Sequence, residues 1–173
     1  MPTLPKHLRP RWRYLGVGIE SWPDATLDRG PFQRELWYAA QNLVGDVGSA
    51  RADLTVLGFR FEAPLGETVV RARHGHVEEA RAVVACLDEV GGDPLGLTVR
   101  GVSGTVRACE ERFCPGLASG GSDEERYLGR PAKSTEERTV VFDGAERTAH
   151  VRGRRADVRT DDAFTGATRF DLE

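Results

Sequence analysis

The stretch LTVRGVSGTVRACEERF, residues 97–113, joins an alternating apolar strand to a short charged helix through a turn of glycine, serine and threonine. Such a turn leaves the first backbone N–H groups of the helix without intrahelical partners and places a partial positive charge there. A phosphate binds well at this kind of helix end, and Arg100 and Arg107 flank it. The same residues also fit an ordinary turn in which Thr105 caps the helix, so both interpretations stay open.

The residues before this helix alternate between strand and helix patterns. Strands are expected at 13–20, 54–62, 68–73 and 95–100, and helices at 31–45 and 77–90. This β-α-β-β-α-β order predicts an α+β fold, a ferredoxin-like or RRM-like sandwich in which an antiparallel four-stranded sheet carries both helices on one face. The other face is expected to stay open, and Gly16 and Gly18 would let a ligand or partner approach it closely.

The composition changes after residue 113. Residues 1–113 are expected to form the ferredoxin-like domain, with a basic N-terminal arm and a C-terminal helix at 106–113. Residues 114–138 are rich in Gly, Ser, Glu and Arg and are predicted to be a mobile loop. Residues 139–173 are predicted to be a small β appendage, whose last residues, 160–173, are either a docking tail or disordered.

The bulk composition excludes some classes of protein. The 173 residues contain no apolar run of membrane-spanning length, so we expect no membrane contact and a cytoplasmic location. The cysteines lack paired-motif spacing, which argues against a disulfide framework. Of 24 basic residues only Lys6 and Lys133 are lysines. This preference for arginine suits phosphate and base recognition, and a genome rich in G and C explains it equally well.

The N-terminal arm is basic and contains no acid. Its basic side chains are those of Lys6, Arg9, Arg11 and Arg13, together with His7. Three prolines keep this arm extended, which suits tracking of a nucleic-acid backbone. A disordered tail that happens to be basic is an equally good interpretation.

No catalytic constellation is evident. His74 and His76 lack a third ligand, and Cys109 and Cys114 form one loose pair, whereas a zinc site usually has two close pairs. No nucleophile has an evident base beside it. The expected third strand, TVVRAR, has no aromatic residue, so base stacking on it is not expected. We therefore expect no catalytic residues and no metal or cofactor bound by the chain, and we favour a binding role.

Three segments together resemble one known family. They are LPKHLRPRWRYL at the start, FQRELWYAAQNLVGD in the first expected helix and VRGVSGTVRACEERF at the end of the sheet. They are similar to archaeal ribonuclease P protein component 2, whose eukaryotic counterpart is shared by the nuclear ribonuclease P and MRP complexes. The resemblance covers roughly residues 4–113, and the closing ATRFDLE is similar to the salt-loving branch of that family.

The resemblance implies a non-catalytic protein subunit of ribonuclease P, the ribonucleoprotein that removes the 5′ leader of precursor tRNA. Its RNA subunit would hold the Mg²⁺ ions and carry out hydrolysis. The protein would support that RNA together with component 3 and other protein subunits, and would meet precursor tRNA through the complex. RNA contacts are expected at Lys6, Arg9, Arg11, Arg13, Arg100, Ser103, Gly104, Thr105 and Arg107.

Two other functions stay open at this point. One is a ferredoxin-like regulatory module that binds a small ligand and self-associates as a dimer through its open sheet face, which Gly16 and Gly18 would suit. The other is an autonomous metal-dependent nuclease, for which the sequence offers no carboxylate or histidine cluster. The sequence does not indicate a role for Cys86, Cys109 or Cys114.

Overall fold

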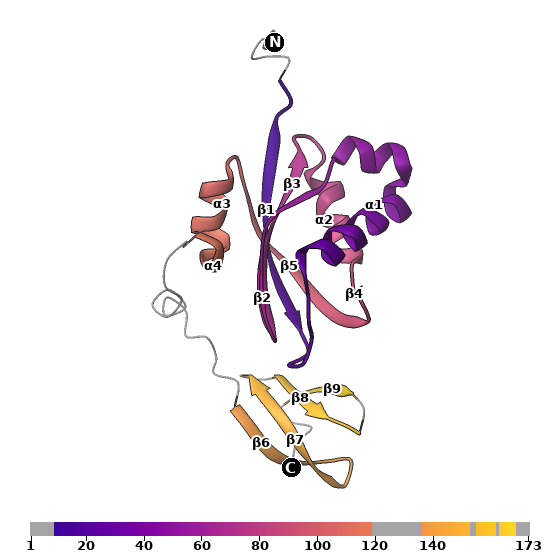
Figure 1. Cartoon of the computed structure of the whole chain (residues 1–173), viewed down its shortest axis with the longest axis vertical. Helices are drawn as coiled ribbons and strands as arrows, with labels where there is room; N and C mark the ends of the chain where they lie inside the picture. Colours follow the sequence, from indigo (N-terminus) through magenta and orange to yellow (C-terminus); the bar gives the residue numbers. More distant parts are fainter. Residues whose placement is uncertain (1–8, 119–135, 153–154, 162, 169–173) are drawn as a thin grey trace. The chain divides into compact units, whose positions relative to one another are not determined.

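The computed structural model describes residues 9–118, 136–152, 155–161 and 163–168. These residues form two compact units, of which the first contains the elements β1 to α4 and the second the strands β6 to β9 (Figure 1). Within the described residues no helix is long and apolar enough to cross a membrane. Lys6 and residues 119–135, the larger part of the expected mobile loop, lie outside the described residues.

The first unit follows the strand and helix order expected from the sequence. Its elements are β1 (Trp12–Ser21), α1 (Arg29–Ala52), β2 (Thr55–Glu62), β3 (Leu65–Arg73), α2 (Val77–Cys86), β4 (Glu89–Val90), β5 (Asp93–Ser103), α3 (Val106–Phe113) and α4 (Pro115–Ala118). The strands pair antiparallel in the order β2-β3-β1-β5-β4, so β1 and β3 lie inside the sheet. The fold is therefore α+β with an antiparallel sheet.

The main core lies between the sheet and the helices α1 and α2. Leu15, Val17 and Ile19 alternate along β1 and are at most 2% exposed, because alternate residues of a strand point to the same face. They pack in one cluster with Phe32 of α1 and Val83 of α2. This layer matches the expected placement of two helices on one face.

Two helix ends differ from the sequence-based expectation. α2 ends at Cys86 and not at Val90, because Glu89–Val90 pairs with the start of β5 as a fifth strand. Gly91 and Gly92 both have positive φ, 63° and 94°, which is the backbone that a two-residue hairpin turn requires. The helix expected to end at Gly45 has non-helical backbone angles at that residue, but it resumes and α1 extends to Ala52.

The second face of the sheet is covered, which corrects the expectation of an open face. Figure 1 shows α1 and α2 on one side of the sheet and α3 and α4 on the other. Cys109, Cys114 and Val69 are fully buried in a second cluster, with Phe113 and Leu117 packed against it. The predicted loop 114–138 therefore begins with a buried cysteine and a short helix that belong to the first unit.

The second unit is a four-stranded antiparallel sheet in the order β6-β7-β8-β9. Its strands are β6 (Glu136–Phe142), β7 (Ala145–Arg152), β8 (Arg155–Arg159) and β9 (Phe164–Thr168). The β appendage was expected, but β9 lies in the residues expected to be a tail. Phe164 is 8% exposed, and its burial explains why this segment forms a strand.

Candidate nucleic-acid interface

The turn that precedes α3 is a capped helix start. Thr105 has extended backbone angles, and its side-chain oxygen accepts a hydrogen bond from the Ala108 N–H at 3.2 Å. Capping satisfies one of the free N–H groups of the first turn and leaves others available to an anion. The structure thus bears out the capping interpretation of Thr105, and the phosphate contact of this turn stays a prediction.

Arg100 is held within the protein. Its Nη1 atom donates to Glu67 Oε1 at 2.5 Å and to the Phe113 carbonyl at 2.9 Å. Glu67 is 8% exposed, and its second carboxylate oxygen accepts the Gly116 N–H at 2.8 Å. Arg100 and Glu67 therefore connect the sheet to the end of α3 and the start of α4. Arg100 therefore has a structural role, and its contact with RNA stays a prediction.

Gly16 and Gly18 make room for the protein's own side chains. A Cβ atom at Gly16 would lie 2.5 Å from the Phe113 Cβ, and one at Gly18 would lie 2.8 Å from the Arg100 Nε. Gly101, opposite Gly16 across the β1–β5 pair, likewise faces the Phe113 ring. The space that suggested a ligand on an open sheet face is therefore filled, and the small-ligand dimer loses the feature that supported it.

The structure brings Arg13 close to the turn. A Cβ at Gly104 would lie 3.8 Å from Arg13 Nη1, which also donates to the Trp12 carbonyl at 3.2 Å. Ser103 is half-buried in β5, opposite Tyr14 of β1. The guanidinium of Arg13 and the start of α3 therefore lie on one end of the sheet.

Arg9, Arg11 and Arg107, the other predicted basic residues that the structure describes, are exposed. The Arg107 side chain is 88% exposed and its Nε lies 2.7 Å from Glu111 Oε1. That hydrogen bond, followed by the charge of Glu111, raises the pKa of Arg107. Arg9 and Arg11 are exposed, and the Arg11 carbonyl accepts the His74 N–H at 2.8 Å.

The sequence interpretation missed three residues at this end of the sheet. Trp12 of β1 lies opposite Arg73 of β3, and Arg71 places its guanidinium carbon 4.0 Å from the centre of the indole ring. Strand pairing alone creates this group. The alternation of Trp12 with Tyr14 and of Arg71 with Arg73 was visible in the sequence, but the register that joins them was not.

Two of the cysteines are structural. Burial raises the pKa of the Cys109 thiol from 9.0 to about 11, and burial with the nearby Glu67 charge raises that of Cys114 from 9.0 to about 12. Their Sγ atoms donate to the carbonyls of Tyr14 and Thr68. Both therefore anchor α3 as protonated thiols, whereas Cys86 is exposed. In the described part of the chain no three His, Cys, Asp or Glu side chains are placed to hold a metal.

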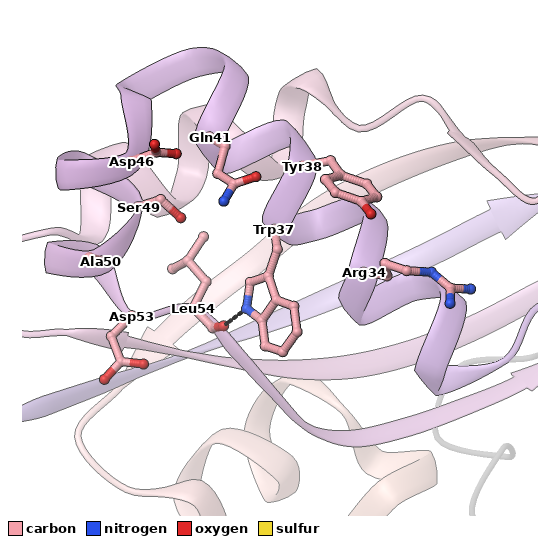
Figure 2. A pocket seen from close by; sticks show the side chains of 9 residues that line it. All are labelled: Arg34, Trp37, Tyr38, Gln41, Asp46, Ser49, Ala50, Asp53 and Leu54. Atoms are coloured by element: carbon pink, nitrogen blue, oxygen red, sulfur yellow. Dashed lines mark hydrogen bonds between the residues drawn. The ribbon is translucent and has the colours of Figure 1, made fainter.

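A different surface lies on the outer side of α1. A shallow depression of about 560 Å³ lies beside Trp37. The indole N–H of Trp37 donates to the Leu54 carbonyl at 2.8 Å, and Figure 2 shows this hydrogen bond among the residues that line the depression. Trp37, Tyr38, Leu43 and Val47, all on α1, are each at least 45% exposed. We call these four side chains the α1 apolar surface.

The comparisons with known proteins identify the family. A sequence profile described as the Rpp14/Pop5 family matches residues 13–114. The chain belongs to the Rpp14/Pop5 family, which confirms the resemblance found in the sequence.

Relatives extend this match over the whole chain. The Ribonuclease P protein component 2 of Halorubrum lacusprofundi is 57% identical over 173 residues, covering 100% of both chains. That of Natronomonas pharaonis is 57% identical over 172 residues, covering 99% of this chain and 98% of the relative. A chain in the cryo-EM structure of yeast ribonuclease MRP matches with a TM-score of 0.43 at 18% identity, over 56% of this chain and 76% of that chain.

Proposed function

We propose that this chain is a protein subunit of ribonuclease P, the ribonucleoprotein that removes the 5′ leader from precursor tRNA. The observation that carries the proposal is 57% identity, over the entire length of both chains, with a relative named Ribonuclease P protein component 2. The strand order β2-β3-β1-β5, with α1 and α2 on one face, supports the ferredoxin-like assignment of the first unit.

The proposed role is to support a catalytic RNA and not to cut the substrate. The Mg²⁺ ions and the hydrolysis belong to the RNA subunit in this proposal. Arg11, Arg13 and Arg107 are exposed or half-exposed near one end of the sheet, where they would neutralise phosphates of the folded RNA. Less repulsion between those phosphates lets the RNA fold at a lower Mg²⁺ concentration. The cytoplasmic location stays a prediction.

The proposed protein partner is component 3, bound at the α1 apolar surface. The second face of the sheet is covered by α3 and α4, whereas Tyr38 and Leu43 are about half-exposed. Glu35, Asp88 and Glu89 line a depression beside these two side chains. This combination fits a partner that offers apolar side chains flanked by basic ones, and exposed aromatic residues are common anchors of such contacts.

Reconstitution tests both parts of the proposal. The full chain is added to ribonuclease P RNA with and without component 3, and leader removal is measured as the Mg²⁺ concentration is lowered. We expect activity at Mg²⁺ concentrations where the RNA alone is inactive. Leu43→Glu should weaken binding to component 3 at least tenfold, because it puts a charge into an apolar contact. Leu65→Glu, at an exposed leucine of the β2–β3 hairpin, is the matched control.

The reconstitution has two informative failures. If the chain leaves the Mg²⁺ requirement of the RNA unchanged in the presence of component 3, the assignment to ribonuclease P is wrong. If Leu43→Glu binds component 3 as well as Leu65→Glu does, the α1 apolar surface is not its binding site.

A further inference from the structure

A group of side chains at the start of β1 and the end of β3 combines an aromatic ring with positive charge. We call Trp12, Arg71, Arg73 and Asp53 the Trp12 patch. The guanidinium carbons of Arg71 and Arg73 lie 4.0 and 5.6 Å from the centre of the Trp12 ring. Trp12 pairs with Arg73 and Tyr14 with Arg71, so the cross-strand partners present their side chains on one face.

The positive charge of the patch is only partly balanced. Asp53 is the nearest carboxylate, and its oxygens lie 3.9 Å from Arg71 and 3.6 Å from Arg73. Both distances are well beyond the 2.7–2.9 Å of a charge-assisted hydrogen bond. The Asp53 carboxylate therefore interacts with two guanidinium groups, and each of these ion pairs is weak.

The two arginines are held differently. Arg71 is 28% exposed, donates to the Thr55 hydroxyl at 3.1 Å, and keeps a buried Nε with no hydrogen-bond partner in the described structure. Its stacking on Trp12 fixes the orientation of both planar groups. The Arg73 side chain is 47% exposed, so its donors remain accessible. The patch thus pairs a fixed aromatic and guanidinium stack with an accessible cation.

We propose that the Trp12 patch binds RNA at an unpaired nucleotide, with the base against the Trp12 and Arg71 stack and the adjoining phosphate on Arg73. This inference rests on the proposed function and specifies where and how RNA is read. Unpaired bases stack on aromatic rings and on guanidinium planes, and phosphates take bidentate hydrogen bonds from arginine. A phosphate at Arg73 would compete with Asp53, whose longer contact is easily replaced.

RNA is the occupant that the charges favour. A protein partner would be expected at exposed apolar side chains, and four of the five large ones in the described part of the chain lie on α1. Base stacking was not expected from the sequence because the third strand has no aromatic residue. The aromatic ring comes from the neighbouring strand β1, and pairing places it opposite Arg73 of that third strand.

The test measures the affinity of the full chain for ribonuclease P RNA as a function of salt concentration. Trp12→Leu should weaken binding roughly 5- to 100-fold, because it removes a stacking surface, and should leave the salt slope unchanged. Arg73→Ala should weaken binding and lower the salt slope by about one, the loss of one phosphate contact. Arg81→Ala, at an arginine of α2 whose side chain is 44% exposed, is the control and should bind like the wild type.

Asp53→Asn adds a test in the opposite direction. Asp53 has a left-handed backbone conformation with φ 49°, which asparagine tolerates, and the change removes the competitor of the phosphate. We expect tighter RNA binding than for Asp24→Asn, an exposed acid elsewhere that controls for net charge. Arg73→Ala carries the test by itself if Trp12→Leu does not fold.

Four outcomes are decisive. Wild-type affinity and salt slope in Arg73→Ala would overturn the proposal, and so would a folded Trp12→Leu variant that binds like the wild type. Equal affinity of Asp53→Asn and Asp24→Asn would show that Asp53 does not compete with the phosphate. A wild-type chain that neither binds the RNA nor lowers its Mg²⁺ requirement contradicts the proposed function itself, which separates that failure from failure of the patch.

Discussion

Replacing Arg100 by alanine should destabilise the first unit. Arg100 donates to Glu67 and to the Phe113 carbonyl, so the change removes two charge-assisted hydrogen bonds. It also leaves the Glu67 side chain, 10% exposed, with the Gly116 N–H as its remaining partner. Hydrogen bonds to charged groups contribute about 1.5–3 kcal/mol each. Because the Arg100 side chain is 39% exposed, water replaces part of this loss.

We therefore expect a loss of about 2 kcal/mol in the free energy of unfolding for Arg100→Ala. For a unit of this size the change corresponds to a fall of roughly 5–10 °C in the melting temperature. Tryptophan fluorescence is the suitable probe, because the chain has 3 tryptophans and all of them, Trp12, Trp22 and Trp37, lie in the first unit.

Arg107→Ala is the matched control for this experiment. Arg107 also pairs with a glutamate, Glu111 of α3, but its side chain is 88% exposed, so the pair should add little to stability. A double variant, Arg100→Ala with Glu67→Ala, should be less unstable than the sum of the two single changes, with a coupling of at least ~1 kcal/mol. Equal melting temperatures for Arg100→Ala and Arg107→Ala, or a coupling near zero, would refute the structural role of Arg100.

Two further predictions concern the packing of α3 on the sheet. At neutral pH a thiol reagent should label Cys86 quickly and should label Cys109 and Cys114 only on unfolding. The pKa values of these two buried thiols are raised in the folded state from 9.0 to about 11 and about 12. Because the same thiols lose their protons near pH 9 in the unfolded chain, the stability of the folded state should fall as the pH rises above about 9. Rapid labelling of all three thiols in the folded chain would contradict this packing. Gly101→Ala should cost about 1–3 kcal/mol of stability, because the new methyl group meets the Phe113 ring, whereas Gly30→Ala meets nothing within 4 Å. Similar unfolding curves for the two variants would argue that α3 does not rest on Gly101.

Much of the fold could be predicted from the sequence because its elements are amphipathic. The helix at 106–113 was predicted with the bounds that α3 has, and the strands expected at 13–20 and 68–73 lie within β1 and β3. β4 was missed because two residues are too few to show a period. The second face of the sheet was predicted to be open because the apolar side of α3 is short. The glycines opposite α3 indicate that another group approaches the sheet closely, but they do not indicate which group.

The apolar pattern of β5, the strand that leads into the turn before α3, contained one further clue to the structure. Leu97, Val99 and Val102 all pack on the main core, so the alternation of β5 slips by one residue between Val99 and Val102. The structure has a register shift there, where Gly16 pairs with Gly101 and Val17 with Val99. Arg100 is the residue left over by this β-bulge. The clue marks Arg100 as unusual, but Glu67, its partner, is 33 residues away in the chain and could not be assigned from the sequence.

The partner of each arginine separates structural from RNA-binding roles in a way that the sequence could not. Arg100 and Arg73 are both arginines on strands of one sheet, and the sequence pattern around them does not distinguish their roles. Arg100 has a nearly buried carboxylate at 2.5 Å, and an RNA phosphate would have to replace that bond and leave the carboxylate without it. Arg73 has a shared carboxylate at 3.6 Å that is 37% exposed, so a phosphate can replace it and Asp53 returns to water at little cost. RNA affinity should therefore depend on Arg73 more than on Arg100 at temperatures where both variants are folded.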